Sequence, residues 1–256
     1  MAKASKRAAV IKKKEILAEG IVSMWLQQPE ITEGAKAGQF VSVYCNNKSR
    51  LLPRPISICE INREEGMLRL VYRVAGEGTK ELSELEVNDT VDIMGPLGNG
   101  FTLEGKKAIL IGGGIGIPPM LELAKELSCE TTMVLGYRNQ DTFLVDEFKA
   151  YGDVYISTED GSLGTKGNVI DAIKANELSA DIIFACGPTP MLRGVKQYAL
   201  EHGITAQISM EERMACGVGA CLACVCKSKE VDHHTHVNNK RICKDGPVFY
   251  AEEVEL

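Results

Sequence analysis

The sequence has no excess of basic residues and no long apolar segment. Its 29 lysines and arginines are outnumbered by 35 aspartates and glutamates, and the net charge of −6 argues against nucleic acid as a main partner. The longest apolar runs, such as residues 108–121, are short and broken by glycines, so they cannot span a bilayer. The N-terminal 17 residues are basic but lack the apolar core of a signal peptide. We therefore expect a cytoplasmic protein with no membrane segment.

Cysteine, by contrast, is abundant and unevenly spread. Five of the nine cysteines fall between positions 216 and 243, which in a cytoplasmic protein indicates metal or redox chemistry rather than disulfides. A scattered cytosolic cysteine is usually a small buried hydrophobic residue, and we interpret Cys45, Cys59, Cys129 and Cys186 in this way.

Residues 1–102 have the pattern of a β domain. Segments 38–45, 54–61, 66–74 and 89–95 alternate apolar and polar residues or form short β-rich runs, with Gly, Asn and Asp between them. Many short strands without a long helix indicate a small barrel or sandwich, and we predict a β-barrel.

Strands and helices alternate from residue 103 to 208. Strands are predicted at 106–114, 130–138, 154–161 and 180–188, and helices at 117–128, 166–178 and 189–203. This alternation predicts a doubly wound parallel sheet that binds ligands at the carboxyl ends of its strands. Residues 209–256 show neither pattern, and so short a cysteine-rich segment has little core without a cofactor.

A glycine-rich turn ends the first strand of this α/β region. In Gly112–Pro119, glycines allow close approach to a pyrophosphate, and the following helix offers free N–H groups. The strict G-x-G-x-x-G pattern is absent because Ile117 holds its third glycine position. A tight turn without a ligand is the alternative interpretation.

Two polar motifs stand out in the β region. Arg54 in "RPIS" is well placed for a phosphate, and the "GEGT" turn at 76–79 offers N–H groups and a hydroxyl to a similar anion. Each motif alone is more typical of a solvated charge or a plain turn than of an anion site. Their joint occurrence ahead of a nucleotide-type α/β region favours anion binding.

The cysteine segment has the spacing of an iron–sulfur site. Cys216, Cys221 and Cys224 follow C-x4-C-x2-C, and Cys243 supplies a distant fourth thiol, which is the plant-type [2Fe–2S] pattern. Four thiolates also suffice for structural zinc. Cys226 is the surplus thiol, although in an extended segment it shares the side of Cys224.

Histidine is scarce, yet three of the four histidines lie close together in this segment: His233, His234 and His236. Rieske-type ligation of a cluster is one interpretation of these histidines. A polar, solvated loop is the other, and we favour it.

The order of the motifs resembles the ferredoxin–NADP reductase superfamily. "GQF" at 38–40, "RPIS", "GEGT", "GPLGNGF" at 95–101, "GGGIGIPP" and "CGPTPM" at 186–191 carry the resemblance. It implies an FAD-binding barrel, a nicotinamide-nucleotide domain, and hydride transfer at their junction. The flavin residues that it implies are Arg54, Pro55, Ile56, Ser57, Val71, Tyr72, Arg73, Gly78 and Thr79. The nicotinamide residues are Gly112, Gly113, Gly114, Gly116, Cys186, Gly187 and Pro188.

The tail narrows this resemblance. "ERMACGVGACLACVC" and "RICKDGPVF" at 241–249 closely resemble the electron-transfer subunit of type B, NAD-dependent dihydroorotate dehydrogenase. That resemblance implies a heterotetramer with an FMN-containing catalytic subunit that oxidises dihydroorotate to orotate in pyrimidine biosynthesis. Electrons then pass through a [2Fe–2S] cluster and FAD to NAD⁺, and Cys243 is the fourth cluster ligand.

Two other functions stay open. One is a related FAD/iron–sulfur reductase that serves ferredoxin, sulfide or polysulfide, or a hydrogenase. The other is a non-enzymatic regulator with a zinc-stabilised tail. The choice of coenzyme depends on Glu159 and Asp160, which repel a 2′-phosphate if they lie near the adenosine ribose, and on Arg138, which attracts one. We predict NAD, largely on the resemblance.

Overall fold

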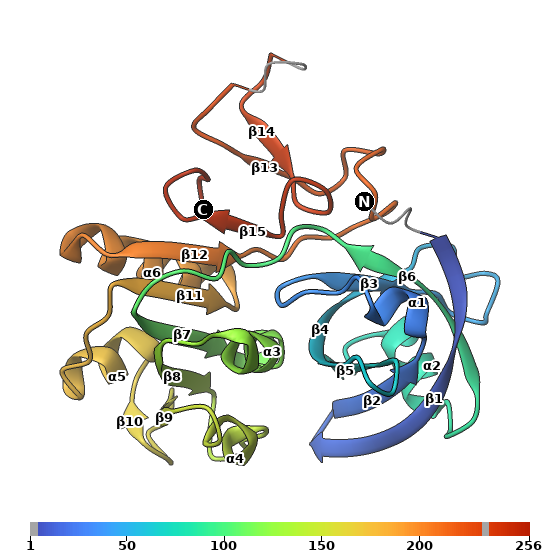
Figure 1. Cartoon of the computed structure of the whole chain (residues 1–256), viewed down its shortest axis with the longest axis horizontal. Helices are drawn as coiled ribbons and strands as arrows, with labels where there is room; N and C mark the ends of the chain where they lie inside the picture. The colour runs from blue at the N-terminus through green and yellow to red at the C-terminus, as the bar shows by residue number, and fades with distance from the viewer. Residues whose placement is uncertain (1–4, 232–235) are drawn as a thin grey trace.

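The computed structural model describes residues 5–231 and 236–256, which form a barrel, an α/β domain and a C-terminal tail (Figure 1). Six strands close the barrel in the order β1-β2-β5-β4-β3-β6. They are β1 (Ser5–Ala18), β2 (Ile21–Gln27), β3 (Phe40–Val43), β4 (Arg54–Asn62), β5 (Met67–Arg73) and β6 (Thr90–Leu97), with short helices α1 (Pro29–Thr32) and α2 (Glu77–Glu84). Burial alternates along β6 because one face of a barrel strand points inward. The predicted β-barrel is confirmed.

The α/β domain contains a seven-stranded sheet in the order β10-β9-β8-β7-β11-β12-β15. Its parallel strands are β7 (Lys107–Gly113), β8 (Glu130–Tyr137), β9 (Asp153–Thr158), β10 (Thr165–Lys166), β11 (Ile182–Cys186) and β12 (Thr205–Ser209). The chain adds β8 to β10 on one side of β7 and then β11 and β12 on the other. This reversal confirms the doubly wound sheet, and the junction of β7 and β11 is where such a sheet binds ligands.

Helices cover both faces of the sheet. The 3₁₀ turn η1 (Gly114–Gly116), α3 (Pro119–Glu126) and α4 (Val145–Phe148) follow β7 and β8, whereas α5 (Val169–Ala175) and α6 (Thr189–His202) precede and follow β11. Leu110 packs in the core with α3 and α4, while Ile109 and Ile111 pack in the core with α5 and α6. Successive strand residues point to opposite faces, so each core receives alternate residues of β7.

The tail joins the sheet instead of forming a separate small domain. It contains a hairpin of β13 (Val225–Lys227) and β14 (Asn239–Arg241), followed by β15 (Val248–Tyr250), which pairs antiparallel with β12. Ile242, Phe249 and Val254 are buried in the same core as Ile208 of β12. The tail therefore uses the α/β core, and Figure 1 shows it lying across the top of both domains.

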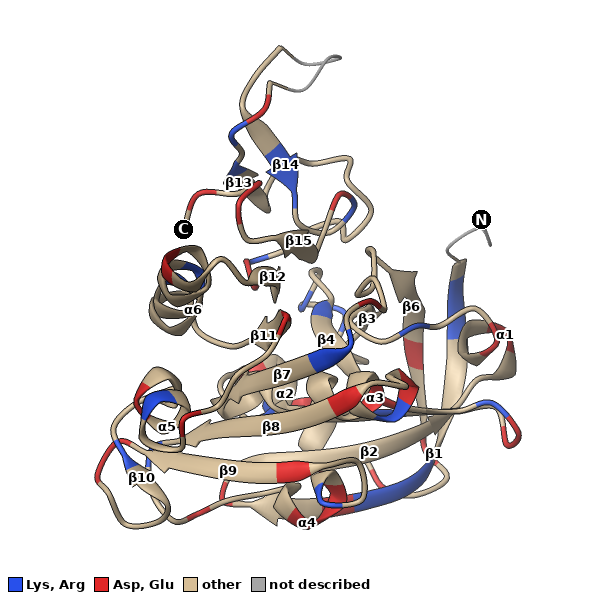
Figure 2. Cartoon of the chain, turned by 60° about the vertical axis from the view of Figure 1, so that its left-hand side comes forward, with Lys and Arg blue, Asp and Glu red and all other residues tan. Residues whose placement is uncertain are grey.

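The surface carries both charges. Figure 2 shows acidic and basic residues interspersed over the barrel, the α/β domain and the tail. Within the described part of the chain, every helix is too short or too polar to cross a bilayer.

Candidate functional site

A cavity of about 330 Å³ opens where the barrel, the α/β domain and the tail meet. The barrel contributes Phe40, Arg54, Pro55, Ile56, Ser57, Val71, Tyr72, Arg73, Ala75 and Thr79; the α/β domain contributes Ile115; and the tail side contributes Ser209, Met210, Glu211, Glu212, Met214 and Pro247. Eight of the nine residues predicted for the flavin thus lie on one cavity wall, although they come from three separate segments. The ninth, Gly78, lies directly behind Arg54.

Arg54 and Gly78 join the "RPIS" and "GEGT" motifs. Gly76 precedes α2 and Thr79 is in its first turn, so "GEGT" begins a helix and is not the isolated turn that we expected. A Cβ at Gly78 would lie 2.5 Å from Arg54 Cζ, so the guanidinium rests on the glycine backbone. The first N–H groups of a helix have no intrahelical partners. A guanidinium beside that helix end is suited to a phosphate group.

Tyr72 places a hydroxyl group in the interior beside the cavity. Its hydroxyl is buried and has no hydrogen-bond partner among the described residues, and burial raises its pKa. Such a group is costly unless a ligand or water satisfies it. Tyr72 lies on the cavity wall beside Val71 and Ile56, so the cavity surface is largely apolar and the buried hydroxyl belongs to one of its lining residues. This composition fits a flavin.

The glycine turn meets the "CGP" turn backbone to backbone. A Cβ on Gly116 would lie 2.5 Å from the carbonyl carbon of Cys186, and one on Gly113 would lie 2.5 Å from Met191 Sδ. Gly112, Gly113, Gly114, Gly116, Cys186, Gly187 and Pro188 therefore come together at the ends of β7 and β11. They lie beside the cavity and do not line it, whereas Ile115 does.

Backbone N–H groups of the cysteine loop point at sulfur. Val218 and Ala220 donate to Cys216 Sγ at 3.4 and 3.3 Å, and Gly219 donates to Cys243 Sγ at 3.1 Å. Gly217 and Gly219 have φ of 70° and 82°, a left-handed conformation that favours glycine. Successive N–H groups in such a turn form a concave site for negative charge.

The four predicted ligands adjoin one another. Cys243 N–H donates to Cys224 Sγ at 3.4 Å. Burial opposes ionisation of Cys216, but N–H donors and the neighbouring Cys221 outweigh it and lower its pKa to about 6. Burial and then Cys224 raise the pKa of Cys243 to about 12. Thiols so close together do not ionise jointly unless a cation offsets their charge, and iron or zinc supplies one.

The donor chemistry therefore fits a metal cluster. Among residues 5–231 and 236–256, no group of three or more Cys, His, Asp or Glu side chains is arranged so that it could hold a metal ion as it stands. The fit depends on the four thiols and on the N–H groups that point at them.

The other candidate ligands lie apart from these contacts. Cys226 is on β13 opposite Lys240, and burial raises its pKa. It lines a second cavity, of about 340 Å³, beside α6. His236 is exposed, and His233 and His234 lie outside the described residues.

The cysteine loop and the "KDGPVF" segment contact the barrel. Asn99 N–H donates to Gly246 O at 2.6 Å, and the Asn99 side chain donates to Asp245 O at 3.0 Å. A Cβ on Gly217 would lie 2.8 Å from Ser42 Oγ, a buried hydroxyl that has no hydrogen-bond partner in the described part of the chain. The cysteine loop therefore lies against barrel strand β3, whose Phe40 lines the cavity.

Sequence reasoning missed the wall that follows β12. Glu211 lines both cavities, so its surface is open to them, and partial desolvation by the surrounding protein atoms raises its pKa. It also lies near the fully buried Cys186, whose pKa rises through burial and then through the Glu211 charge. No spacing signal links residue 211 to the motifs before it.

The coenzyme-selecting candidates lie together. Asp160 N–H donates to Arg138 O at 3.3 Å, and Glu159 N–H donates to Tyr137 O at 3.2 Å, at the carboxyl ends of β8 and β9. Hydrogen bonds from Ser162 lower the pKa of Asp160, so its charge is retained.

Comparison with known proteins agrees with this three-part site. The chain matches the oxidoreductase FAD-binding domain over residues 8–101 and the oxidoreductase NAD-binding domain over residues 110–197. The fold recurs in a ferredoxin reductase of carbazole 1,9a-dioxygenase (TM-score 0.68, 20% identity, 80% of this chain and 68% of that one). The class is therefore a ferredoxin-reductase-like flavoprotein oxidoreductase.

Residues 211–255 match the iron–sulfur cluster binding domain of dihydroorotate dehydrogenase B. The chain is 42% identical to the electron transfer subunit of dihydroorotate dehydrogenase B (NAD⁺) of Fusobacterium nucleatum over 94% of its length and 95% of the relative's. The same identity and coverage hold for the Bacillus caldolyticus subunit. This chain belongs to the family of dihydroorotate dehydrogenase B electron transfer subunits. It is also similar to a solved NADH-dependent reduced ferredoxin–NADP oxidoreductase (TM-score 0.87, 34% identity, 100% of this chain and 91% of that one).

Proposed function

We propose that this chain takes electrons from the FMN of a dihydroorotate dehydrogenase catalytic subunit and passes them through a [2Fe–2S] cluster and FAD to NAD⁺. The reaction belongs to pyrimidine biosynthesis, and the assembly is a heterotetramer with two copies of each subunit. One observation carries the proposal: the cavity lies between the cysteine-bearing tail and the glycine turn, with Met214 on one side and Ile115 on the other. A cytoplasmic location agrees with nine unpaired cysteines.

The proposed division of the chain is 1–102 for FAD, 103–208 for NAD and 209–256 for the cluster, with β15 of the last unit inserted in the sheet of the second. Arg54, Pro55, Ile56, Ser57, Val71, Tyr72, Arg73, Gly78 and Thr79 bind FAD in this proposal. Gly112, Gly113, Gly114, Gly116, Cys186, Gly187 and Pro188 bind NAD, and Cys216, Cys221, Cys224 and Cys243 bind the cluster.

When bound, FAD exchanges a hydride with nicotinamide and single electrons with an iron–sulfur cluster. The residues of the chain bind and orient these groups. Arg54 and the start of α2 hold the pyrophosphate, and Tyr72 forms part of the cavity wall against the flavin. N–H groups of the Gly217–Ala220 turn stabilise thiolate charge at the cluster.

Selection of NAD is proposed to come from Glu159 and Asp160. Both follow β9 at the edge where an adenosine ribose is expected, and their negative charges repel a 2′-phosphate. Arg138 lies at the same edge, but the two carboxylates outnumber it.

A second function is supported by a specific observation. The 34% identity to the solved NADH-dependent reduced ferredoxin–NADP oxidoreductase extends over the whole of this chain. A subunit of a ferredoxin-coupled NAD(P)H reductase is therefore the alternative. The match of residues 211–255 to the dihydroorotate dehydrogenase B cluster domain favours the first proposal.

The test starts with anaerobic purification of the full chain. We expect flavin and [2Fe–2S] absorption, with two irons per FAD. Co-expression with an FMN-containing dihydroorotate dehydrogenase subunit should then give dihydroorotate-dependent reduction of NAD⁺. A complex with all cofactors that is inactive with dihydroorotate but reduces ferredoxin would establish the alternative. A colourless protein containing zinc would contradict both and favour the zinc-stabilised regulator.

A further inference from the structure

The outer half of β4 lies beyond the reach of its neighbour β3. These strands pair only from Arg54 to Ser57 on β4, although β4 continues to Asn62. The backbone N–H and C=O of Ile61 therefore lie past the end of that pairing, and an unpaired strand edge must have its N–H and C=O groups covered by other partners.

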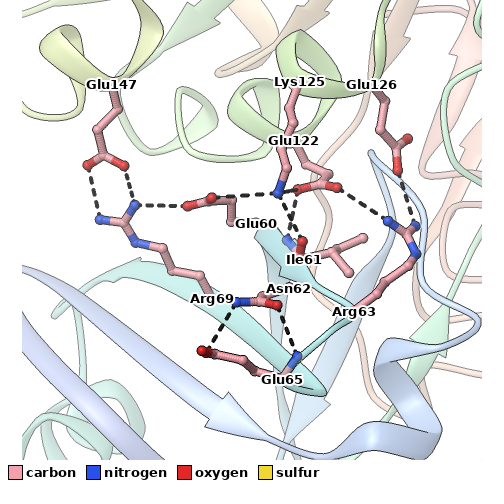
Figure 3. Close-up of polar contacts among 10 residues, drawn as sticks. All are labelled: Glu60, Ile61, Asn62, Arg63, Glu65, Arg69, Glu122, Lys125, Glu126 and Glu147. Atoms are coloured by element: carbon pink, nitrogen blue, oxygen red, sulfur yellow. Dashed lines mark hydrogen bonds and ion pairs between the residues drawn. The ribbon is translucent and has the colours of Figure 1, made fainter. Parts of the chain in front are cut away.

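Helix α3 of the other domain covers this edge. Ile61 N–H donates to Glu122 Oε2 at 2.8 Å, and Lys125 Nζ donates to Ile61 O at 3.0 Å (Figure 3). Glu122 and Lys125 are three residues apart and share a helix face, so both bond to the backbone of one residue of β4. Glu122 is completely buried, and Arg63 approaches its other oxygen at 3.9 Å.

A second polar contact crosses the same interface one strand away. The Arg69 guanidinium of β5, 4% exposed, pairs with both carboxylate oxygens of Glu147 on α4. Arg69 also donates to Ser23 Oγ at 2.9 Å and to Glu60 at 3.2 Å. A two-point Arg–carboxylate contact fixes orientation as well as distance. Figure 3 shows the two contacts side by side across the domain boundary.

The elements joined here also carry the cofactor segments. β4 starts at Arg54, β5 runs through Val71 and Tyr72, and α3 follows the glycine turn whose Ile115 faces the same cavity. Any rotation of α3 against β4 and β5 would therefore move the glycine turn relative to the flavin wall.

We propose that Glu122 and Arg69 are positioning residues that hold the glycine turn of the nicotinamide domain in register with the flavin wall for hydride transfer. This inference rests on the proposed function. Hydride transfer requires the reacting atoms about 3–3.5 Å apart, and a misplacement of about 1 Å costs about 10²-fold in rate. The affinities for FAD and NADH depend less on this register, so a change in it should lower the rate of hydride transfer without weakening the binding of either cofactor.

The experiment compares Glu122→Met with Glu122→Gln in the full, cofactor-loaded chain. Met has a similar length but only a weakly accepting sulfur, whereas Gln keeps a carbonyl oxygen for Ile61 N–H. We expect Glu122→Met to lower the limiting rate of flavin reduction by NADH at least about tenfold. FAD content and the NADH Kd should stay near wild type, and the nicotinamide–flavin charge-transfer band should weaken. The Ile61 amide should exchange hydrogen faster in this variant. Glu122→Gln should resemble wild type in the rate of flavin reduction and in the exchange of the Ile61 amide.

A milder pair covers the possibility that Glu122→Met does not fold. Glu147→Gln weakens the Arg69 contact, and Asp146→Asn on the same helix is the matched control because Asp146 is 91% exposed and pairs only locally with Lys149. The rate should fall in the first variant and not in the second. Wild-type rates in both Glu122→Met and Glu147→Gln, with faster Ile61 exchange in the former, would overturn the positioning role. A wild-type chain whose flavin NADH does not reduce would overturn the proposed function instead.

Discussion

Replacing Gly78 by alanine tests the link between the two anion-binding motifs. The new Cβ would lie 2.1 Å from Arg54 Nε, against about 3.5 Å for an ordinary contact, so the guanidinium must move by about 1.4 Å. The guanidinium is the end of a flexible side chain, so the fold accommodates the methyl group. We therefore expect the free energy of unfolding of the apoprotein to stay near wild type.

FAD affinity should respond differently from stability. If Arg54 contacts the pyrophosphate, displacing it removes a charge-assisted hydrogen bond of about 1.5–3 kcal/mol, which raises the FAD Kd about 10- to 100-fold. Quenching of FAD fluorescence during titration of the apoprotein measures this change. Gly34→Ala is the barrel control because its Cβ meets only Pro96 Cγ, at 3.9 Å. An unchanged Kd in Gly78→Ala would refute the role given to Arg54.

Three further predictions concern the cluster, the coenzyme and pH. Cys243→Ser should abolish the cluster absorption and electron paramagnetic resonance signals while retaining FAD, and Cys226→Ser should retain both; the opposite result would make Cys226 the fourth ligand. Glu159→Gln combined with Asp160→Asn should raise kcat/KM for NADPH relative to NADH about 30-fold, since each of the two like-charge contacts near water costs about 1 kcal/mol. Burial raises the pKa of Glu211 above its ordinary 4.5, so the folded state keeps a proton that the unfolded chain has lost, and stability falls as pH rises through this interval. Glu211→Gln should therefore have a higher Tm than wild type at pH 7 and the same Tm as wild type below about pH 4. A variant whose Tm equals that of wild type at both pH values would contradict this prediction.

Local patterns predicted the strands whose signal is contained in their own residues. The expected strand at 54–61 is Arg54–Asn62, and the one at 106–114 is Lys107–Gly113. β1, by contrast, contains several lysines and was not predicted, because its place in the barrel comes from pairing with β2 and β6. β15 has only three residues and exists through its pairing with β12.

The site shows the same division. Motif order predicted that Arg54, Tyr72 and Thr79 belong together, and the structure brings them to one cavity. It did not indicate Glu211, which reaches the cavity because β12 ends there. Glu122 was hidden for another reason: Pro119–Ala124 is buried at every position, so helical periodicity does not distinguish its polar residue from its apolar neighbours.

Apolar packing is present at both interfaces of the α/β domain, because Cys59 and Val71 of the barrel share a core with Leu121 of α3, but the barrel interface also contains directional polar contacts. The tail joins the sheet through β12–β15 pairing and the apolar packing of Ile208 and Phe249. The barrel meets α3 and α4 through a completely buried carboxylate and an almost completely buried guanidinium. Apolar burial is non-directional, whereas a two-point ion pair and a bond to a fixed peptide group both define an angle. Directional contacts therefore lie at the boundary across which a hydride must pass, where a small rotation has the largest effect on rate.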